Sequence, residues 1–265
     1  KKMSRAQILS PLEEVFFDSG LMDDLITHIS IPQLLIGEQP IYQGVILFGP
    51  PGTGKSEFQS AACKTYENAG AYSKMISTSA VNSCYVGQFA RNLEKELKIG
   101  QNKGKTRKKP SFLCFDEGSI LAQKANQGSS ASKHYQEAID VMKRYIGNPC
   151  GNWLVLGITT NQLSEEFEDA LTRQGRLASF FVDMPKKQQI SDMWRHFLKK
   201  HKVIEINQEQ SDELTELTHY ASGAFINQFT KAYFSNRRTN LLRQKGYQSM
   251  LEALKEGVEI SEKDV

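Results

Sequence analysis

Short apolar runs alternate with helix-like segments through the first part of the chain, roughly residues 1–185. Apolar runs of this length, separated by helical patterns, are typical of parallel strands joined by crossover helices. We therefore predict an α/β fold in which a mostly parallel, five-stranded sheet lies between two layers of helices. The expected strands are Gly44–Phe48, Lys74–Ser77, Ser111–Phe115, Trp153–Thr159 and Ser179–Met184.

The pattern changes after Met184 and Pro185, where the strand-like runs stop. Helical spacing follows, because apolar residues recur at intervals of three and four positions over 190–198 and again over 226–233. The sequence therefore predicts two domains, an α/β domain over residues 1–185 and a small all-helical domain over 186–265.

Composition sets limits on the kind of protein. A chain of 265 residues can bury a full core, and its net charge of +3 is too small to indicate nucleic acid by itself. No apolar run reaches transmembrane length and no signal-peptide pattern opens the chain, so no membrane association is expected. Scattered cysteines without a C-x-x-C pair favour reduced thiols in the cytoplasm, with an organelle stroma or the nucleus still open: Cys63, Cys84, Cys114 and Cys150.

One segment, LFGPPGTGKSEF, interrupts the apolar pattern with glycines and prolines. Its spacing is G-x-x-x-x-G-K-[ST], with Gly49 first and Gly54, Lys55 and Ser56 last. In such a loop the backbone N–H groups cradle an anion, the lysine reaches the β- and γ-phosphates, and the hydroxyl is placed to hold Mg²⁺. Because the segment follows an expected strand and opens an expected helix, we predict a phosphate-binding loop rather than a bare turn.

A second polar group follows the apolar strand in FLCFDEGS, residues 112–119. Asp116 and Glu117 would emerge at the carboxyl end of the strand, where open α/β sheets bind ligands. There Asp116 would hold the water shell of Mg²⁺, and Glu117 would orient and deprotonate the attacking water. The strand WLVLGITTN also ends in polar residues, and Asn161 could contact the γ-phosphate or that water.

Taken in order, GPPGTGKS, FDEGS, ITTN and ALTRQGR resemble the Walker A, Walker B, sensor 1 and arginine-finger motifs of the AAA ATPase family. FFDSGL (16–21) and ASGAF (221–225) are similar to the segment that opens the family's module and to a turn of its helical lid. The resemblance covers nearly all of the chain. It implies a P-loop NTPase αβα fold followed by a helical lid, ATP hydrolysis, and ATP and Mg²⁺ as cofactors.

The resemblance also implies roles for single residues, which differ with their place in the site. The adenine would lie near Asp18, Gly20, Gly223 and Ala224, and His196 would join them only with a one-residue gap in the match. Phosphate and metal would be bound by Pro51, Gly52, Thr53, Gly54, Lys55 and Ser56, with Ser56 and Asp116 holding the metal. Catalysis would use Glu117, Asn161, Arg173 and Arg176, the two arginines acting on the nucleotide of a neighbouring subunit.

NSCYVGQF (82–89) is similar to the family's pore loop, in which Tyr85 and Val86 would grip a polypeptide in the centre of a ring. The alternative is that Tyr85 is an ordinary core residue beside a strand end. The chain departs from the family pattern at Gly118 and Ser119 and lacks a clear sensor-2 arginine. Since about 40 residues precede the phosphate loop and the lid ends the chain, we expect a motor module without a separate substrate-recruiting domain.

A basic segment over residues 103–109 has glycine and no apolar periodicity, which favours a solvated loop over a nucleic-acid patch. The function that we expect is an ATP-driven ring, by resemblance a hexamer, that remodels or threads a protein target, directly or through an adaptor. The alternatives are a nucleic-acid motor or loader, supported only by the basic segment, and a nucleotide-switched scaffold. Tyr85 weighs against the first alternative and Glu117 against the second.

Overall fold

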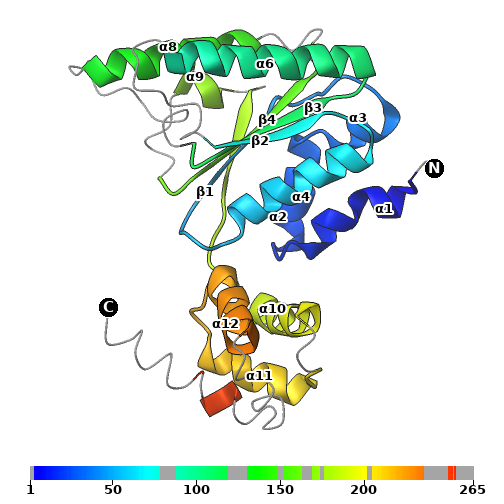
Figure 1. The fold of residues 1–265 in the computed structure, drawn as a ribbon, viewed down its shortest axis with the longest axis vertical. Coiled ribbons are helices and arrows are strands. Elements are labelled where there is room, and N and C mark those ends of the chain that lie inside the picture. The colour runs from blue at the N-terminus through cyan, green and yellow to red at the C-terminus, as the bar shows by residue number, and fades with distance from the viewer. Residues whose placement is uncertain are drawn as a thin grey trace. The chain divides into compact units, whose positions relative to one another are not determined.

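The computed structural model describes residues 3–77, 88–118, 130–147, 152–162, 169–173, 176–201, 205–235, 250–252 and 254 (Figure 1). The chain divides into two compact units. The first comprises Lys1–Gly49 and Lys55–Val182, and the second comprises Pro50–Gly54 and Asp183–Val265. The domain boundary expected after residue 185 stays a prediction.

The first unit contains a five-stranded sheet in the order β2-β3-β4-β1-β5. Every pairing between neighbouring strands is parallel, which confirms the α/β class. The last strand begins at Leu177, two residues earlier than the sequence indicated. The strands are β1 (Gly44–Phe48), β2 (Ser73–Ser77), β3 (Ser111–Asp116), β4 (Leu154–Thr160) and β5 (Leu177–Phe181).

Helices cover both faces of this sheet, as Figure 1 shows, and each face has its own apolar core. One core lies between the sheet, α4 and the N-terminal helices, and the other lies between the sheet, α6 and α8. The expected three-layer arrangement is therefore confirmed. The helices are α1 (Arg5–Leu9), the 3₁₀ helix Ser10–Glu14, α2 (Ser19–His28), α3 (Ile31–Ile36), α4 (Lys55–Asn68), α6 (Gln88–Arg107), α8 (Ser130–Ile146) and α9 (Asp169–Thr172).

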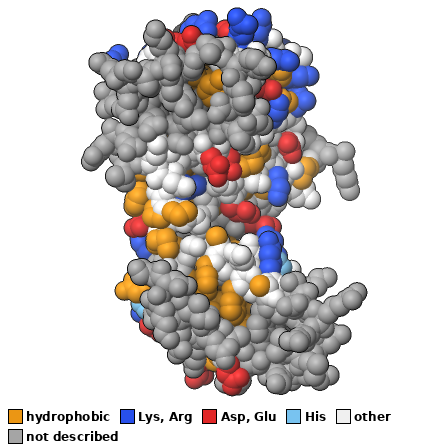
Figure 2. All heavy atoms as spheres, turned by 60° about the vertical axis from the view of Figure 1, so that its left-hand side comes forward, with side chains coloured by type: hydrophobic (Ala, Val, Ile, Leu, Met, Phe, Trp, Pro, Cys, Tyr) orange, Lys and Arg blue, Asp and Glu red, His pale blue; other side chains and the backbone are white. Residues whose placement is uncertain are grey.

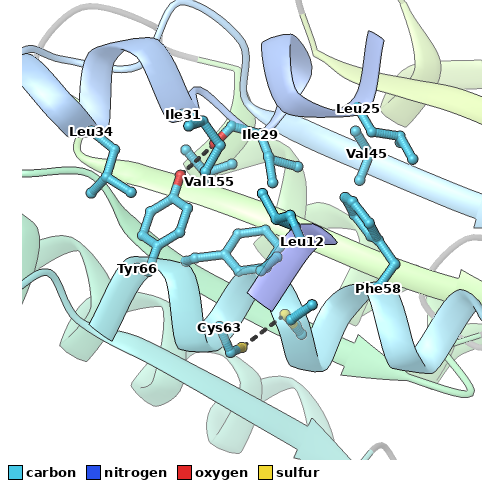
Figure 3. Packing of buried hydrophobic residues seen from close by; sticks show 14 of the residues in the cluster. Leu12, Leu25, Ile29, Ile31, Leu34, Val45, Phe58, Cys63, Tyr66 and Val155 are labelled. Carbon is cyan, nitrogen blue, oxygen red and sulfur yellow. Dashed lines mark hydrogen bonds between the residues drawn. The ribbon is translucent and has the colours of Figure 1, made fainter. Parts of the chain in front are cut away.

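The core beside α4 combines apolar packing with two polar contacts (Figure 3). The buried Tyr66 hydroxyl donates a hydrogen bond to the carbonyl of Ile29, which ties α4 to the chain between α2 and α3. Cys63 of α4 and Cys114 of β3 are free thiols whose sulfur atoms lie 3.3 Å apart. Both contacts hold the helix that follows the phosphate loop against its neighbours.

The basic segment corrects one expectation, because most of it is helix rather than loop. Residues 103–107 form the last turns of α6. The helical period was hidden because two glycines, Gly100 and Gly104, continue the buried stripe of Leu93 and Leu97. A Cβ on Gly104 would lie 2.6 Å from the carbonyl oxygen of Trp153, so only glycine allows this close approach. On the face drawn in Figure 2, basic side chains gather at the level of α6 and α8.

The described part of the second unit after Val182 contains the helices α10 (Lys187–Lys200), α11 (Gln208–Leu217) and α12 (Gly223–Ser235). These elements confirm the helices expected over 190–198 and 226–233. Trp194 is fully buried, and its indole N–H donates to the Thr218 hydroxyl at 2.9 Å. Across the described residues, no helix is both long enough and apolar enough to cross a membrane.

Candidate functional site

The phosphate loop begins where β1 ends. Gly49 has φ 141°, and a Cβ there would lie 2.3 Å from the Val182 carbonyl oxygen, so the turn requires glycine. Lys55 opens α4 with 6% of its surface exposed, and its ammonium donates to the Gly49 carbonyl oxygen at 2.8 Å. The pKa of Lys55 is lowered, because the effect of burial exceeds the opposite effect of the nearby Asp116 carboxylate. This is a desolvated cation held in place at a helix N-terminus.

The middle of the loop, Pro50–Gly54, is grouped with the second unit and contacts the start of α12. The Gly52 carbonyl accepts a hydrogen bond from the Ala224 N–H at 3.2 Å. Gly52 has φ 77°, and a Cβ there would lie 2.7 Å from the Ser222 hydroxyl oxygen. Ser222 in turn caps α12, since its hydroxyl accepts the Phe225 N–H at 3.2 Å. Gly223 and Ala224, expected near the adenine, therefore lie beside the loop's own backbone.

Asp116 is the last residue of β3, and two hydroxyl groups converge on one of its carboxylate oxygens. The Ser56 hydroxyl donates to Oδ1 at 2.7 Å, and the Thr159 hydroxyl donates to the same atom at 2.6 Å. The structure thus brings the two predicted metal ligands, Ser56 and Asp116, into direct contact. These are hard oxygen donors, which is the chemistry that Mg²⁺ prefers.

Glu117 follows with an exposed side chain and a left-handed backbone, φ 53°. Its N–H donates to the Thr159 hydroxyl at 3.2 Å, and the N–H of Gly118 donates to the Thr159 carbonyl at 2.7 Å. A Cβ on Gly118 would lie 2.7 Å from the Ile158 side chain. The departure from the family pattern at residue 118 therefore has a steric explanation, because the turn approaches β4 too closely for a side chain.

Thr159 is the residue that the sequence analysis missed in this site. The sequence predicted a role for Asn161 instead, which lies just beyond β4 and is exposed. Thr159 is buried within β4, and its hydroxyl contacts both carboxylate-bearing residues. The contact follows from the register of β3 and β4. Phe115 pairs with Ile158, so the next residues of the two parallel strands, Asp116 and Thr159, are also neighbours.

The two arginines lie at the other edge of the sheet. Arg176 directly precedes β5, and its N–H donates to the Arg173 carbonyl at 3.0 Å. Leu177 pairs with Gly44, the first residue of β1, whereas the phosphate loop follows the last residue of β1. Strands of this length separate the two edges by about 15 Å or more. The structure therefore does not bring Arg173 and Arg176 to the phosphate loop of their own chain.

The remaining predicted residues are less informative. Asp18 caps α2, since its carboxylate accepts the Leu21 N–H at 3.0 Å, and Gly20 lies in the first turn of that helix. His196 lies on α10 with its ring edge-on to Phe197. Tyr85 and Val86 lie outside the described residues. No group of three or more His, Cys, Asp or Glu side chains could hold a metal by itself within the described ranges.

Residues 45–183, just over half of the chain, match the profile of the ATPase family associated with various cellular activities (AAA). The chain belongs to this family.

Its curated relatives include vacuolar protein sorting-associated protein 4A of Homo sapiens, which is 27% identical over 210 residues, 78% of this chain and 45% of the relative. Spastin of Dictyostelium discoideum is 26% identical over 77% of this chain and 30% of its own length. The proteasome-activating nucleotidase of Archaeoglobus fulgidus is 27% identical over 69% of this chain and 44% of its own length. The chain spans less than half the length of these relatives.

Proposed function

We propose that this chain is an ATP-hydrolysing motor that acts as a ring, by resemblance a hexamer, on a protein target. The observation that carries the hydrolytic part is the contact between the loop and the carboxylates. The Ser56 hydroxyl lies 2.7 Å from the Asp116 carboxylate. Ser56 directly follows the buried Lys55, and Asp116 directly precedes Glu117 in the chain. These are the groups that phosphoryl transfer to water needs.

In this proposal the N–H groups of the loop, with Gly52, Thr53 and Gly54 at its centre and Pro51 beside them, hold the phosphates of ATP. Lys55 neutralises charge on the β- and γ-phosphates, and its present partner, the Gly49 carbonyl, keeps the ammonium at the loop. Mg²⁺ would be held by Ser56 and Asp116 together with phosphate oxygens, and it would neutralise the charge that develops there. The base would be Glu117, which takes a proton from the attacking water, while Asn161 contacts that water or the γ-phosphate.

The position of the arginines supports a ring. A transferred phosphoryl group needs a cation beyond Lys55 and Mg²⁺, and Arg173 and Arg176 lie at the opposite edge of the sheet from their own chain's carboxylates. A neighbouring copy could present its arginines to this chain's nucleotide if subunits meet edge to edge. The separation of the two edges thus supports arginine fingers that act between subunits.

A protein target is favoured by the relatives, one of which is named for vacuolar protein sorting and another for activating the proteasome. The nucleic-acid alternative lost part of its support, because two members of the basic segment have structural partners. Arg107 donates to the Ala71 carbonyl at 2.6 Å, and Lys109 donates to the Ala69 carbonyl. The same proposal includes a grip of Tyr85 and Val86 on the target, recruitment through an adaptor and a cytoplasmic location. It also includes contacts to the adenine from Asp18, Gly20, Gly223 and Ala224.

The experiment is an ATPase assay on wild type and Glu117→Gln, with nucleotide binding measured on both. We expect the glutamine variant to bind ATP normally and to hydrolyse it about 10²–10⁴-fold more slowly, because it keeps the shape of the side chain but cannot accept the proton. Glu213→Gln, an exposed glutamate on α11, is the matched control and should keep the wild-type rate. Equal rates in wild type and Glu117→Gln would refute the assignment. If Glu117→Gln is slow, as expected, it should hold ATP and target together, and a pull-down with this variant would identify the target.

A further inference from the structure

Thr159 makes more of the contacts that hold the Asp116–Gly118 turn than its place in the sequence suggests. Its hydroxyl donates to Asp116 at 2.6 Å and accepts the N–H of Glu117 at 3.2 Å. Its carbonyl accepts the N–H of Gly118 at 2.7 Å. We propose that Thr159 is a positioning residue for hydrolysis, which acts by holding Glu117 in its left-handed backbone conformation. The inference rests on the proposed role of Glu117 as the base.

The backbone of Glu117 needs such support. At φ 53° it occupies a region that L-residues other than glycine rarely adopt, and such conformations persist only where surrounding contacts hold them. The two N–H groups that bond to Thr159 belong to Glu117 itself and to the residue that follows. Thr159 therefore holds the strained residue from both of its ends.

Gly118 is also needed for this arrangement of the turn against β4. The turn can approach β4 only because Gly118 lacks a side chain, since a Cβ would lie 2.7 Å from Ile158 and 3.2 Å from the Phe115 carbonyl oxygen. An alanine would push the turn away from β4 and lengthen the hydrogen bond to the Thr159 carbonyl. Gly118 and the hydroxyl of Thr159 thus both keep the Asp116–Gly118 turn in the same position against β4.

One hydroxyl group can serve both carboxylate-bearing residues because it has one proton and two lone pairs. The proton goes to the Asp116 carboxylate, and a lone pair accepts from the Glu117 N–H. Serine keeps both interactions, whereas valine has nearly the same shape and keeps neither. This pair of substitutions separates the hydrogen bonds from packing.

The test compares kcat and KM for ATP in wild type, Thr159→Val and Thr159→Ser. We expect kcat to fall about 10- to 100-fold in the valine variant, the range in which small misplacements of a catalytic group act. KM for ATP should stay within about twofold, because Lys55 and the loop are untouched, and serine should restore most of kcat. Gly118→Ala should lower kcat in the same way, so it serves if the valine variant does not fold.

A double variant decides whether Thr159 acts through Glu117. In Thr159→Val/Glu117→Gln, hydrolysis should be no slower than in Glu117→Gln alone, because the base that Thr159 positions is already gone. Additive losses, or a wild-type kcat in both Thr159→Val and Gly118→Ala, would overturn the inference while a slow Glu117→Gln still supports the proposed function. Wild-type hydrolysis that does not respond to Glu117→Gln would overturn both.

Discussion

The two edges of the sheet both carry polar side chains, but they use them differently. At the carboxyl edge, Ser56 and Thr159 converge on the Asp116 carboxylate, beside a lysine whose pKa is lowered by burial. At the amino edge, two buried amides face one another: Asn152 donates to the Gln43 side chain and to the Tyr145 carbonyl, and it accepts the N–H of Leu154.

This difference distinguishes groups that can act on a ligand from groups that stabilise the fold. The amides at the amino edge are neutral, and Asn152 satisfies backbone groups that would otherwise be buried without a partner. The carboxyl edge has ionisable groups in Lys55, Asp116 and Glu117. Glu117 and Ser56 are also exposed there, so they can meet a ligand. Substitutions at the amino edge should therefore change stability, whereas substitutions at the carboxyl edge should change binding and rate. The arginines are the exception, because they are amino-edge residues to which we assign a catalytic role.

That exception gives the largest expected effect. Arg173→Ala/Arg176→Ala should lower ATPase activity about 10³–10⁵-fold, because arginine fingers stabilise the charge of the transition state by this order. Mixed with Lys55→Ala subunits, which are also inactive alone, the double variant should recover some activity, since a ring can place an intact arginine against an intact loop. Wild-type specific activity should fall on dilution. Full activity in a monomer, measured by sedimentation alongside the assay, would contradict the assignment.

Lys55→Ala should have the next largest effect, at the carboxyl edge. Nucleotide affinity should fall by about tenfold to a hundredfold, because a hydrogen bond to a charged group contributes about 1.5–3 kcal/mol. Thermal stability should not fall in parallel, because the substitution also removes a desolvated charge. Lys103→Ala, an exposed lysine on α6, is the control for the loss of one positive charge. Calorimetric titration with ATP and a melting curve on each variant measure both quantities.

Asn152→Ala tests the amino edge and should give the opposite pattern. It leaves the Tyr145 carbonyl and the Leu154 N–H without their side-chain partner, so the free energy of unfolding should fall by about 2–3 kcal/mol. The rate of hydrolysis per folded molecule should stay at the wild-type value. Asn102→Ala on the exposed face of α6 controls for the loss of an amide. A loss of rate without a loss of stability would break the separation of the two edges.

Tyr66→Phe has the smallest expected effect and concerns neither edge. It removes the hydrogen bond to the Ile29 carbonyl, so unfolding should be easier by about 1–2 kcal/mol at neutral pH. Burial raises the pKa of Tyr66 well above its usual range, so its contribution to stability is complete below about pH 10, the unfolded value, and is lost as the pH rises further. The difference between wild type and Tyr66→Phe in denaturant titrations should therefore shrink above about pH 10. A difference that stays constant well above that pH would contradict this.

The class of fold and the main groups of the site could be predicted from the sequence. The strand positions follow from short apolar runs, and the phosphate loop and carboxylate pair follow from local spacing that needs no knowledge of distant contacts. Lys55, Ser56, Asp116 and Glu117 could be identified because each lies at the end of an element that the sequence itself marks. The roles of Arg173, Arg176 and Asn161 rest on resemblance, since each residue type is common at surfaces and turns.

Features that depend on strand register and close approach could not be predicted from the sequence, because they are visible only in the folded chain. Thr159 meets Asp116 across 43 positions of sequence, and a threonine in a buried strand carries no mark of that partner. The end of α6 was hidden because its buried stripe continues through glycines, whose purpose is visible only beside Trp153. The left-handed Glu117 was hidden for the same reason, because the contacts that hold it come from another strand. Local spacing specifies which groups can react, but the packing of β3 against β4 fixes where those groups are held.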